Sequence, residues 1–330
     1  MQHVRLGRTG LPVSRLCLGT MTFGLQCDEP TAVAILDRAA AGGITFLDTS
    51  DVYPQGGGLE TAGRTEEILG RWMQGRRHDF VIATKCFGAM GARPWDRGLS
   101  RKHVLDAIEG SLRRLRTDYV DVYQLHHPDP ATPMDETLRA LDDVVRAGKA
   151  RYVGCSNYYA YQVARALGRS ELRDRARFEC VQPRYNLLFR QVERELLPLC
   201  AEEGLGVIPY NPIAGGLLSG KHRRDAGPLP GTRFTHAAAG PTYRERYWHE
   251  RELATVEALR PLAAEAGMSM VQMAVAWVLA NPLITSPIVG ATRPEQLDDA
   301  VSAVDKGLDG GLKARLDELT LQYRWGDDIR

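Results

Sequence analysis

The chain has 330 residues, of which 44% are hydrophobic and 25% charged, and its formal net charge is +1. Such a balance gives no overall basic field to attract nucleic acid or an anionic membrane. No hydrophobic run is long enough to span a bilayer, and the polar start MQHVRLGRTG lacks the apolar segment of a secretory signal. We therefore expect a cytoplasmic globular protein that binds neither nucleic acid nor membrane.

The cysteines are scattered, and no pair or Cys/His cluster has the spacing of metal ligands. They are Cys17, Cys27, Cys86, Cys155, Cys180 and Cys200. Reduced, partly buried thiols in a cytosolic protein are the favoured interpretation, so we expect no metal site. A reactive thiol is the less favoured alternative for the cysteine at position 86.

Strand-like and helix-like segments alternate along the chain. A hairpin is expected over residues 3–16, which hold a Gly-rich turn. Strands are then predicted over 17–19, 44–48, 79–85, 119–126, 150–156, 178–182, 206–211 and 285–291. Helices are predicted over 31–43, 64–74, 100–115, 134–148, 158–168, 191–204 and 295–305, with Ser100 as an N-cap.

Eight mostly apolar strands that alternate with helices predict a parallel (β/α)8 barrel preceded by a β-hairpin. Such a barrel uses about 250 residues, often more with insertions, so residues 1–330 are expected to form a single domain. A doubly wound open sheet is the alternative. Against it, no GxGxxG motif follows the first strand.

Two segments interrupt the alternation. Residues 213–246, after the seventh strand, are rich in Gly, Pro, Ala and Arg and are too long for a routine connection. Long loops of this kind are usually lids or mobile segments. Three aromatic residues lie at or just after the end of this segment and either close a substrate pocket or pack the loop: Tyr243, Tyr247 and Trp248. The second segment, 54–67, contains three consecutive glycines.

Four chemically active residues lie at or near the ends of successive strands. Asp48 ends ITFLD, Tyr53 follows on the loop, Lys85 ends FVIATK and His126 ends VDVYQLH. Barrel enzymes place their chemistry at this end of the strands. A lysine ammonium stabilises a phenolate, an aspartate keeps the lysine charged, and a histidine can donate to a substrate oxygen. Together they could protonate a carbonyl that becomes an alkoxide, provided that a cofactor supplies the hydride.

The segments DTSDVY, ATK and YQLHHPD resemble the catalytic tetrad segments of the aldo-keto reductases. The resemblance extends from LGRTGLPVSRLCLGTMTFG to GATRPEQLDDA, which is nearly the whole chain. It implies a (β/α)8 barrel that binds NADP(H) and transfers hydride to aldehydes or ketones. It makes Tyr53 the general acid, Lys85 the residue that lowers its pKa, Asp48 the ion-pair partner and His126 the group that polarises the carbonyl.

The same resemblance implies the cofactor-binding residues. The nicotinamide and its ribose would contact Gly19, Thr20, Met21, Ser156, Asn157, Gln182 and Tyr210. The pyrophosphate would lie along Asn211, Pro212, Ile213, Ala214 and Gly215, with Lys221 and Arg233 nearby. The adenosine 2′-phosphate would contact Gly290, Thr292, Arg293 and Gln296. An arginine guanidinium matches a phosphate, which favours NADP over NAD.

The sequence departs from the family pattern at two places. Ala300 stands where the family usually has an asparagine, so one adenine contact is expected to be missing. His127 stands where many relatives have an aromatic residue. It would make one side of the substrate pocket more polar, and it competes with His126 for the catalytic role; we assign that role to His126 because it ends the strand.

Three functions remain open. The first is an NADPH-dependent carbonyl reductase, whose substrate would be a keto-deoxysugar nucleotide, a natural-product ketone or a plainer aldehyde. The second is a non-enzymatic, cofactor-binding regulatory subunit like the potassium-channel β subunits. The third is an isomerase or aldolase that forms a Schiff base on Lys85, which Asp48 opposes because such a lysine must be neutral. A homo-oligomer is possible with any of them.

Overall fold

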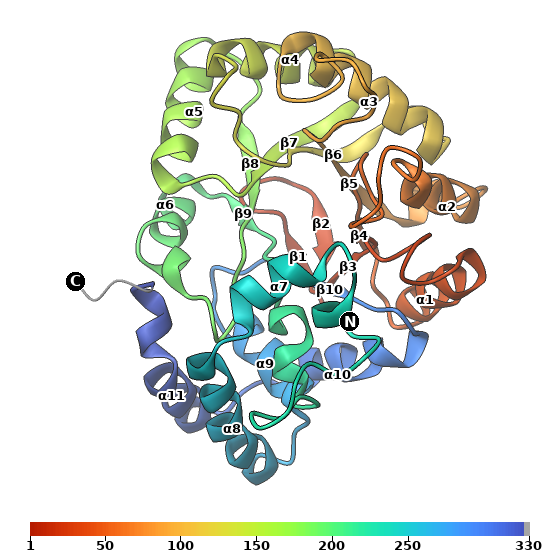
Figure 1. Ribbon diagram of the computed structural model, residues 1–330. Helices are drawn as coiled ribbons and strands as arrows, with labels where there is room; N and C mark the ends of the chain where they lie inside the picture. Colours follow the sequence, from red (N-terminus) through yellow and green to blue (C-terminus); the bar gives the residue numbers. More distant parts are fainter. Residues whose placement is uncertain (327–330) are drawn as a thin grey trace.

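The structure, a computed structural model, describes residues 1–326, and residues 327–330 of the expected domain lie outside it. In the described part eight parallel strands form one sheet, in the order β10-β3-β4-β5-β6-β7-β8-β9. They are β3 (Cys17–Gly19), β4 (Phe46–Asp48), β5 (Val81–Cys86), β6 (Val120–Leu125), β7 (Ala150–Ser156), β8 (Phe178–Gln182), β9 (Gly206–Val207) and β10 (Ile288–Gly290). The amide of Ile288 donates to the carbonyl of Pro209 at 2.8 Å, which closes the circle. The (β/α)8 barrel is confirmed (Figure 1), and the open-sheet alternative is wrong.

Helices surround the strands (Figure 1). They include α1 (Glu29–Ala41), α2 (Arg64–Trp72), α3 (Arg101–Leu115), α4 (Met134–Arg146), α5 (Ala160–Leu172), α6 (Leu196–Glu203) and α10 (Asp298–Lys306). Side-chain caps fix several starts: Asp28 accepts from the amide of Thr31, and Ser100 accepts from that of His103. The N-cap expected at Ser100 is therefore confirmed, because it satisfies an amide that the helix itself leaves free.

The N-terminal hairpin closes the bottom of the barrel. Strands β1 (His3–Arg5) and β2 (Pro12–Ser14) pair antiparallel. Leu6 and Val13 are fully buried and pack in the same cluster as Phe46 and Val122 from the barrel strands. Apolar side chains therefore fill this end of the barrel, and the pocket opens at the opposite end, where the strands terminate.

The connection after β9 is more ordered than the sequence indicates. It contains the short 3-10 helices η3 (Ala214–Ser219) and η4 (Arg233–Thr235), followed by α7 (Gly240–Tyr247), which crosses in front of the strands in Figure 1. The predicted strand 206–211 stops early because Pro209 has no amide to continue the ladder. An isolated bridge between Tyr210 and Ile288 continues the pairing further on.

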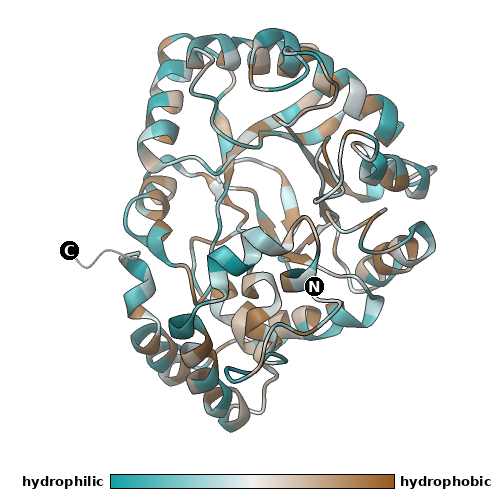
Figure 2. Cartoon of the chain, viewed as in Figure 1, coloured by the Kyte–Doolittle hydropathy of each residue, from teal (hydrophilic) through white to brown (hydrophobic). Residues whose placement is uncertain are grey.

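Two helices that the alternation alone does not predict follow: α8 (Glu250–Glu265) and α9 (Met270–Leu279). Trp277 of α9 is 1% exposed and packs in the core, and α9 is largely hydrophobic in Figure 2. Within residues 1–326 no single helix is long and apolar enough to cross a membrane. The pair α8 and α9 passes by length and composition together, but it is bent by 91°.

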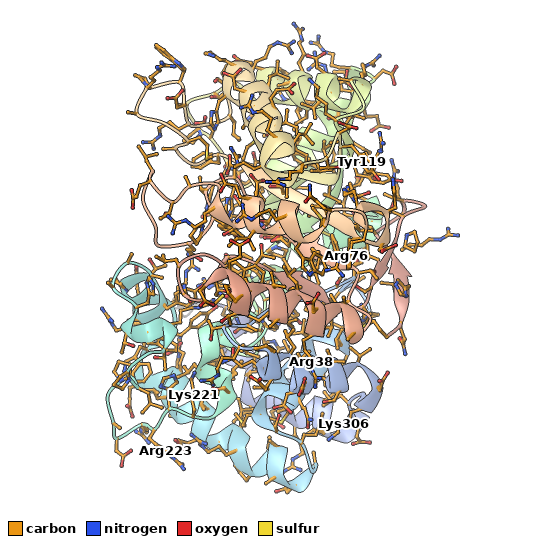
Figure 3. All side chains as sticks on the ribbon, turned by 90° about the vertical axis from the view of Figure 1, so that its right-hand side faces the viewer. Arg38, Arg76, Tyr119, Lys221, Arg223 and Lys306 are labelled. Atoms are coloured by element: carbon orange, nitrogen blue, oxygen red, sulfur yellow. The ribbon has the colours of Figure 1, made fainter. Side chains whose placement is uncertain are left out.

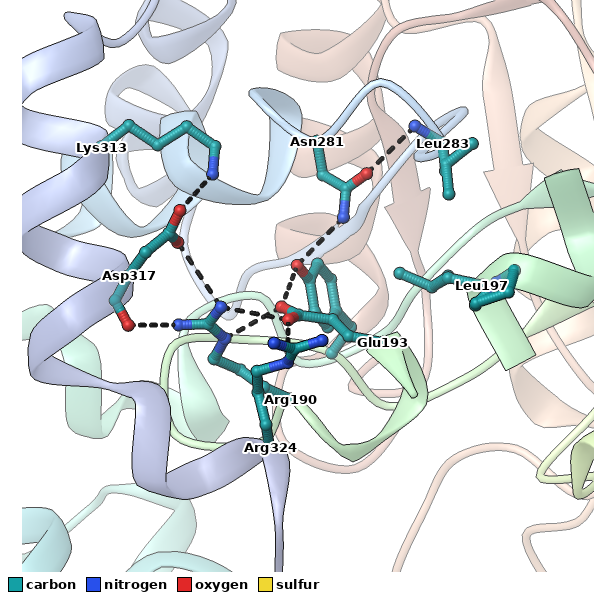
Figure 4. A pocket seen from close by; sticks show the side chains of 10 residues that line it. Arg190, Glu193, Leu197, Asn281, Leu283, Lys313, Asp317 and Arg324 are labelled. Atoms are coloured by element: carbon teal, nitrogen blue, oxygen red, sulfur yellow. Dashed lines mark hydrogen bonds and ion pairs between the residues drawn. The ribbon is translucent and has the colours of Figure 1, made fainter. Parts of the chain in front are cut away.

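The chain ends in α11 (Gly310–Leu319) and the 3-10 helix η6 (Leu321–Arg324), which a charged network attaches to the barrel (Figure 4). The Arg190 guanidinium donates to the carbonyl of Asp317 at 2.8 Å and to the carboxylate of Glu193 at 2.9 Å. Arg324 also pairs with Glu193, at 3.0 Å. This network lines an open surface pocket of about 290 Å³ whose charged side chains are already paired with one another.

Candidate active site

The barrel brings Asp48 and Lys85 together beneath its open end. Asp48 ends β4, and Lys85 is the penultimate residue of β5. The Lys85 Nζ lies 2.5 Å from Asp48 Oδ1 and donates to the carbonyl of Thr49 at 2.7 Å. The side chain of Lys85 is fully buried. Burial alone would lower its pKa, but the Asp48 carboxylate and the Tyr53 phenol outweigh burial and raise it. The lysine is therefore held as an ammonium.

Tyr53 lies above this ion pair. The Lys85 Nζ is 5.1 Å from the centre of the Tyr53 ring, and the His126 ring is 5.7 Å from it in an edge-on arrangement of 78°. Burial raises the pKa of the phenol, and the positive charge of Lys85 opposes that rise. The net pKa is above the ordinary value for tyrosine. The lysine acts in the expected direction but does not overcome the loss of hydration.

The two adjacent histidines occupy different positions. His126 is the one beside Tyr53, and its Nδ1 lies 3.2 Å from Ser50 Oγ. Burial, followed by repulsion from Lys85, lowers the pKa of His126 well below its usual value, so the ring is neutral. His127 stacks on His126, with 5.1 Å between the ring centres, and also lines the pocket described below.

A pocket of about 1030 Å³ opens above these residues. Asp48, Tyr53 and His126 line it, whereas Lys85 lies below its floor. The expected cofactor residues that line it are Gly19, Thr20, Met21, Ser156, Asn157, Gln182, Tyr210, Asn211, Pro212, Ile213, Gly215, Lys221, Arg233, Gly290, Thr292, Arg293 and Gln296. Ala214 does not line it, because its side chain is fully buried in the core.

Hydrogen bonds connect the polar residues of the pocket wall. The Tyr210 hydroxyl donates to Asn157 Oδ1 at 2.8 Å, and Asn157 Nδ2 donates to the carbonyl of His126 at 2.9 Å. Gln182 Nε2 donates to Asp48 Oδ2 at 2.8 Å. Asn157 and Asn211 have φ values of 63° and 59°, in the left-handed region. Such strain at non-glycine residues is typical of functional sites.

Three cations gather along the pocket, and none has a carboxylate partner among residues 1–326. Lys221, Arg233 and Arg293 all line it. Loss of hydration lowers the pKa of Lys221, and the charges of Arg293 and Arg233 lower it further, so the three groups are close enough to repel one another. The Arg233 guanidinium donates to the Tyr243 hydroxyl at 3.2 Å. Like charges held together in this way suit a ligand with more than one phosphate.

The aromatic residues after the long loop divide between the two expected roles. Tyr243 lines the pocket and packs on Gly215, where a Cβ would lie 2.4 Å from its ring. Gly215 also has a φ of 67°, which a side chain would strain. Tyr247 is fully buried, and its hydroxyl accepts from Asn186 Nδ2 at 3.1 Å. Trp248 packs against Phe234 of the loop.

Sequence reasoning missed four residues of the site. Gln124 Nε2 donates to Asp48 Oδ2 at 3.3 Å. Ser50 Oγ contacts His126 and also donates to Asp51 Oδ1, and the buried Oδ2 of Asp51 has no hydrogen-bond partner in the described part of the chain. Arg246 of α7 also lines the pocket. The position of Gln124 two residues before the strand-end histidine was a usable signal. Nothing local marks Arg246, because only the fold of the loop turns it inward.

No group of three or more His, Cys, Asp or Glu side chains in residues 1–326 is arranged to hold a metal ion. All the cysteines are buried and free. Burial raises the pKa of the Cys86 thiol, which removes the reactivity that its position beside Lys85 suggests.

The model of the aldo/keto reductase family matches residues 15–320. The chain is 41% identical over 327 residues to "Uncharacterized oxidoreductase YrpG" of Bacillus subtilis (strain 168), covering 97% of this chain and 96% of that protein. It is 40% identical over 313 residues to "Probable voltage-gated potassium channel subunit beta" of Arabidopsis thaliana, covering 92% of each. It is 33% identical over 330 residues to "Versiconal hemiacetal acetate reductase" of Aspergillus parasiticus, again covering 92% of each.

The family model and the similarity to an oxidoreductase indicate that this protein is an oxidoreductase. The chain belongs to the aldo/keto reductase family, which reduces carbonyl groups with a nicotinamide cofactor. The family that the motifs suggested is confirmed.

Proposed function

We propose that this protein is an NADPH-dependent reductase of aldehydes or ketones in which Tyr53 is the general acid. One observation carries the proposal: Tyr53 lies between a buried Lys85–Asp48 ion pair and a neutral His126 at the floor of a pocket of about 1030 Å³. Tyr53 can therefore supply a proton, and His126 a hydrogen bond, to the same substrate oxygen in this pocket.

Bound NADPH would supply the hydride. The residues of this chain handle the oxygen. When Ser50 Oγ donates to Nδ1 of His126, the ring proton is on Nε2, which then donates to the carbonyl oxygen. The Tyr53 hydroxyl gives its proton to the same oxygen as negative charge develops there. Lys85 stabilises the phenolate that remains, and Asp48 keeps Lys85 charged and in position.

The cluster of Lys221, Arg233 and Arg293 supports a cofactor that carries several phosphates. It also supports NADP over NAD. Lys221 and Arg233 suit the pyrophosphate, and Arg293 suits the 2′-phosphate. Arg293 is the N-cap of the 3-10 helix η5 (Pro294–Leu297), and Gln296 holds its neighbour Thr292 by accepting from that amide at 2.8 Å. Ala300 lines the same end, so the missing asparagine leaves an apolar contact there.

The Schiff-base alternative is disfavoured because Lys85 is buried, ion-paired and outside the pocket lining. The regulatory-subunit alternative keeps its support from the relatives named as channel subunits. For the substrate, a keto-deoxysugar nucleotide, a natural-product ketone and a smaller aldehyde stay the candidates, because the volume of the pocket includes the part that would hold the cofactor.

Fluorescence titration with NADPH and NADH, followed by turnover of 4-nitrobenzaldehyde, tests the proposal. We expect tighter binding of NADPH and measurable reduction, which Tyr53→Phe removes. Tight NADPH binding with no turnover of any aldehyde or ketone would favour the regulatory subunit. Trapping of a lysine adduct by borohydride would favour the Schiff base.

A further inference from the structure

Helix α7 forms the wall of the pocket near Tyr53. Its Tyr243 and Tyr247 are buried and fix the helix against the barrel. Arg246 is three residues after Tyr243, so the two side chains share a face of the helix, and both line the pocket. The position of Arg246 is thus set by two buried aromatic anchors on its own helix.

The Arg246 guanidinium faces the carbonyl end of the pocket. Burial lowers the pKa of His127, and the charge of Arg246 lowers it further. Burial raises the pKa of Tyr210 to about 12, and Arg246 is the first charge that opposes the rise. Since Tyr210, His126, His127 and Arg246 all line the same pocket, the charge of Arg246 lies near the space where a carbonyl compound would lie.

Arg246 is half-buried, and within residues 1–326 no carboxylate lies within ion-pair distance of it; its recorded contact is the Tyr243 ring, 6.0 Å away. Two other shielded arginines, by contrast, have carboxylate partners. Arg77 pairs with Asp121 at 2.7 Å, and Arg114 pairs with Glu66 at 2.7 Å. An arginine that is partly removed from water without a partner is unfavourable unless a ligand supplies the counter-charge.

The pocket supplies no such counter-charge at this end. The carboxylates among its described lining residues are Asp48, Glu295 and Asp299. Asp48 is committed to Lys85. Glu295 and Asp299 lie in η5 and α10, beside Arg293 at the adenosine end. The carbonyl end therefore presents an unopposed positive charge.

We propose that Arg246 binds an anionic group of the substrate, so that the preferred substrates are carbonyl compounds with a carboxylate or a phosphate. This rests on the reductase activity proposed above. A guanidinium binds either anion through two parallel hydrogen bonds. His127, neutral and adjacent, is available to donate to the same group. The carbonyl then lies at Tyr53 and His126, while the anion lies under α7.

The test compares charged aldehydes with neutral isosteres. The three isomers of carboxybenzaldehyde and their methyl esters are assayed with NADPH, using wild type, Arg246→Gln, Arg246→Lys and, as control, Arg223→Gln. Arg223 is exposed on the same long loop, outside the pocket lining, and lies at the edge of the molecule in Figure 3. A parallel pair, 4-formylphenyl phosphate and 4-methoxybenzaldehyde, distinguishes phosphate from carboxylate.

We expect wild type to prefer at least one acid over its ester. Arg246→Gln should lower kcat/KM for that acid by about 10- to 100-fold, mainly through KM, because a charge-assisted pair is lost. The esters should change by less than about threefold, Arg246→Lys should recover part of the loss, and the control should match wild type. Equal loss for acids and esters, or no preference for any acid, would overturn the inference.

A binding measurement keeps the two proposals separable. If no aldehyde is reduced at all, the reductase proposal fails. Binding of 4-methylbenzoate and of its methyl ester to the NADP⁺ complex still reports on Arg246, because neither compound can be reduced at an aldehyde. Preference for the benzoate that disappears in Arg246→Gln supports the anion site, and equal binding contradicts it.

Discussion

The ion pair beneath Tyr53 gives a quantitative prediction for Lys85→Met. If the phenolate charge is placed at the ring centre, it lies 5.1 Å from Lys85 Nζ. At an effective dielectric constant of about 20, two unit charges at that separation interact by about 3 kcal/mol. A difference of that size corresponds to about 2 pKa units. Removing the ammonium should therefore raise the pKa of Tyr53 by about this amount.

The assay is the pH dependence of kcat in both directions. Reduction at neutral pH should slow by about 100-fold, because the weaker acid gives its proton less readily. Alcohol oxidation needs the phenolate, so a higher pKa moves its rising limb to higher pH by about 2 units. NADPH affinity should hardly change, because Lys85 lies below the pocket floor.

A second variant separates chemistry from folding. Lys85→Met leaves Asp48 buried without its cation, which costs about 3–5 kcal/mol of stability for a buried pair. Asp48→Asn/Lys85→Met removes that lone carboxylate and should recover stability without recovering the rate. An unshifted oxidation limb in a folded Lys85→Met protein would refute the electrostatic role of the lysine.

Three further predictions concern other parts of the chain. Arg293→Ala should weaken NADPH much more than NADH in fluorescence titration, and an equal loss would argue against a 2′-phosphate contact. Burial, with repulsion from Glu66, raises the pKa of Asp51 to about 8; because this exceeds the unfolded value, the carboxyl destabilises the fold increasingly as pH rises from about 4 to 8. Near pH 9 the free energy of unfolding in urea should thus be higher for Asp51→Asn than for wild type, by on the order of 5 kcal/mol at most. Equal free energies of unfolding at that pH would contradict a buried, uncompensated acid. Trp277→Ala should lose about 3–5 kcal/mol in the same measurement, since the ring is 1% exposed and its Nε1 donates to Asp317 at 2.8 Å; a loss below about 1 kcal/mol would mean that the site collapses around the gap.

The strands of the barrel and the four residues at their ends were predictable because each is encoded locally. Apolar runs mark the strands, and a polar residue at the end of a run marks the open rim, as with Asp48 and Lys85. The N-cap at Ser100 was readable for the same reason.

Features that depend on long-range packing were not predictable. Helix α7 forms where a loop was expected, because buried aromatics such as Tyr247 hold it against the barrel. Ala214 was expected along the pyrophosphate from its place in the motif, but its side chain is buried in the core. The pKa of Tyr53 depends on a balance between burial and Lys85, and no sequence pattern expresses that balance.

Single-turnover oxidation of bound NADPH by Tyr53→Phe, with an activated aldehyde in excess, tests the central claim most directly. Loss of the phenolic proton donor beside the Lys85 ammonium should slow the hydride step by about 100-fold or more, while the dissociation constant for NADPH stays near that of wild type. A wild-type rate in that variant would mean that the proton comes from another group, and the assignment of this site would be wrong.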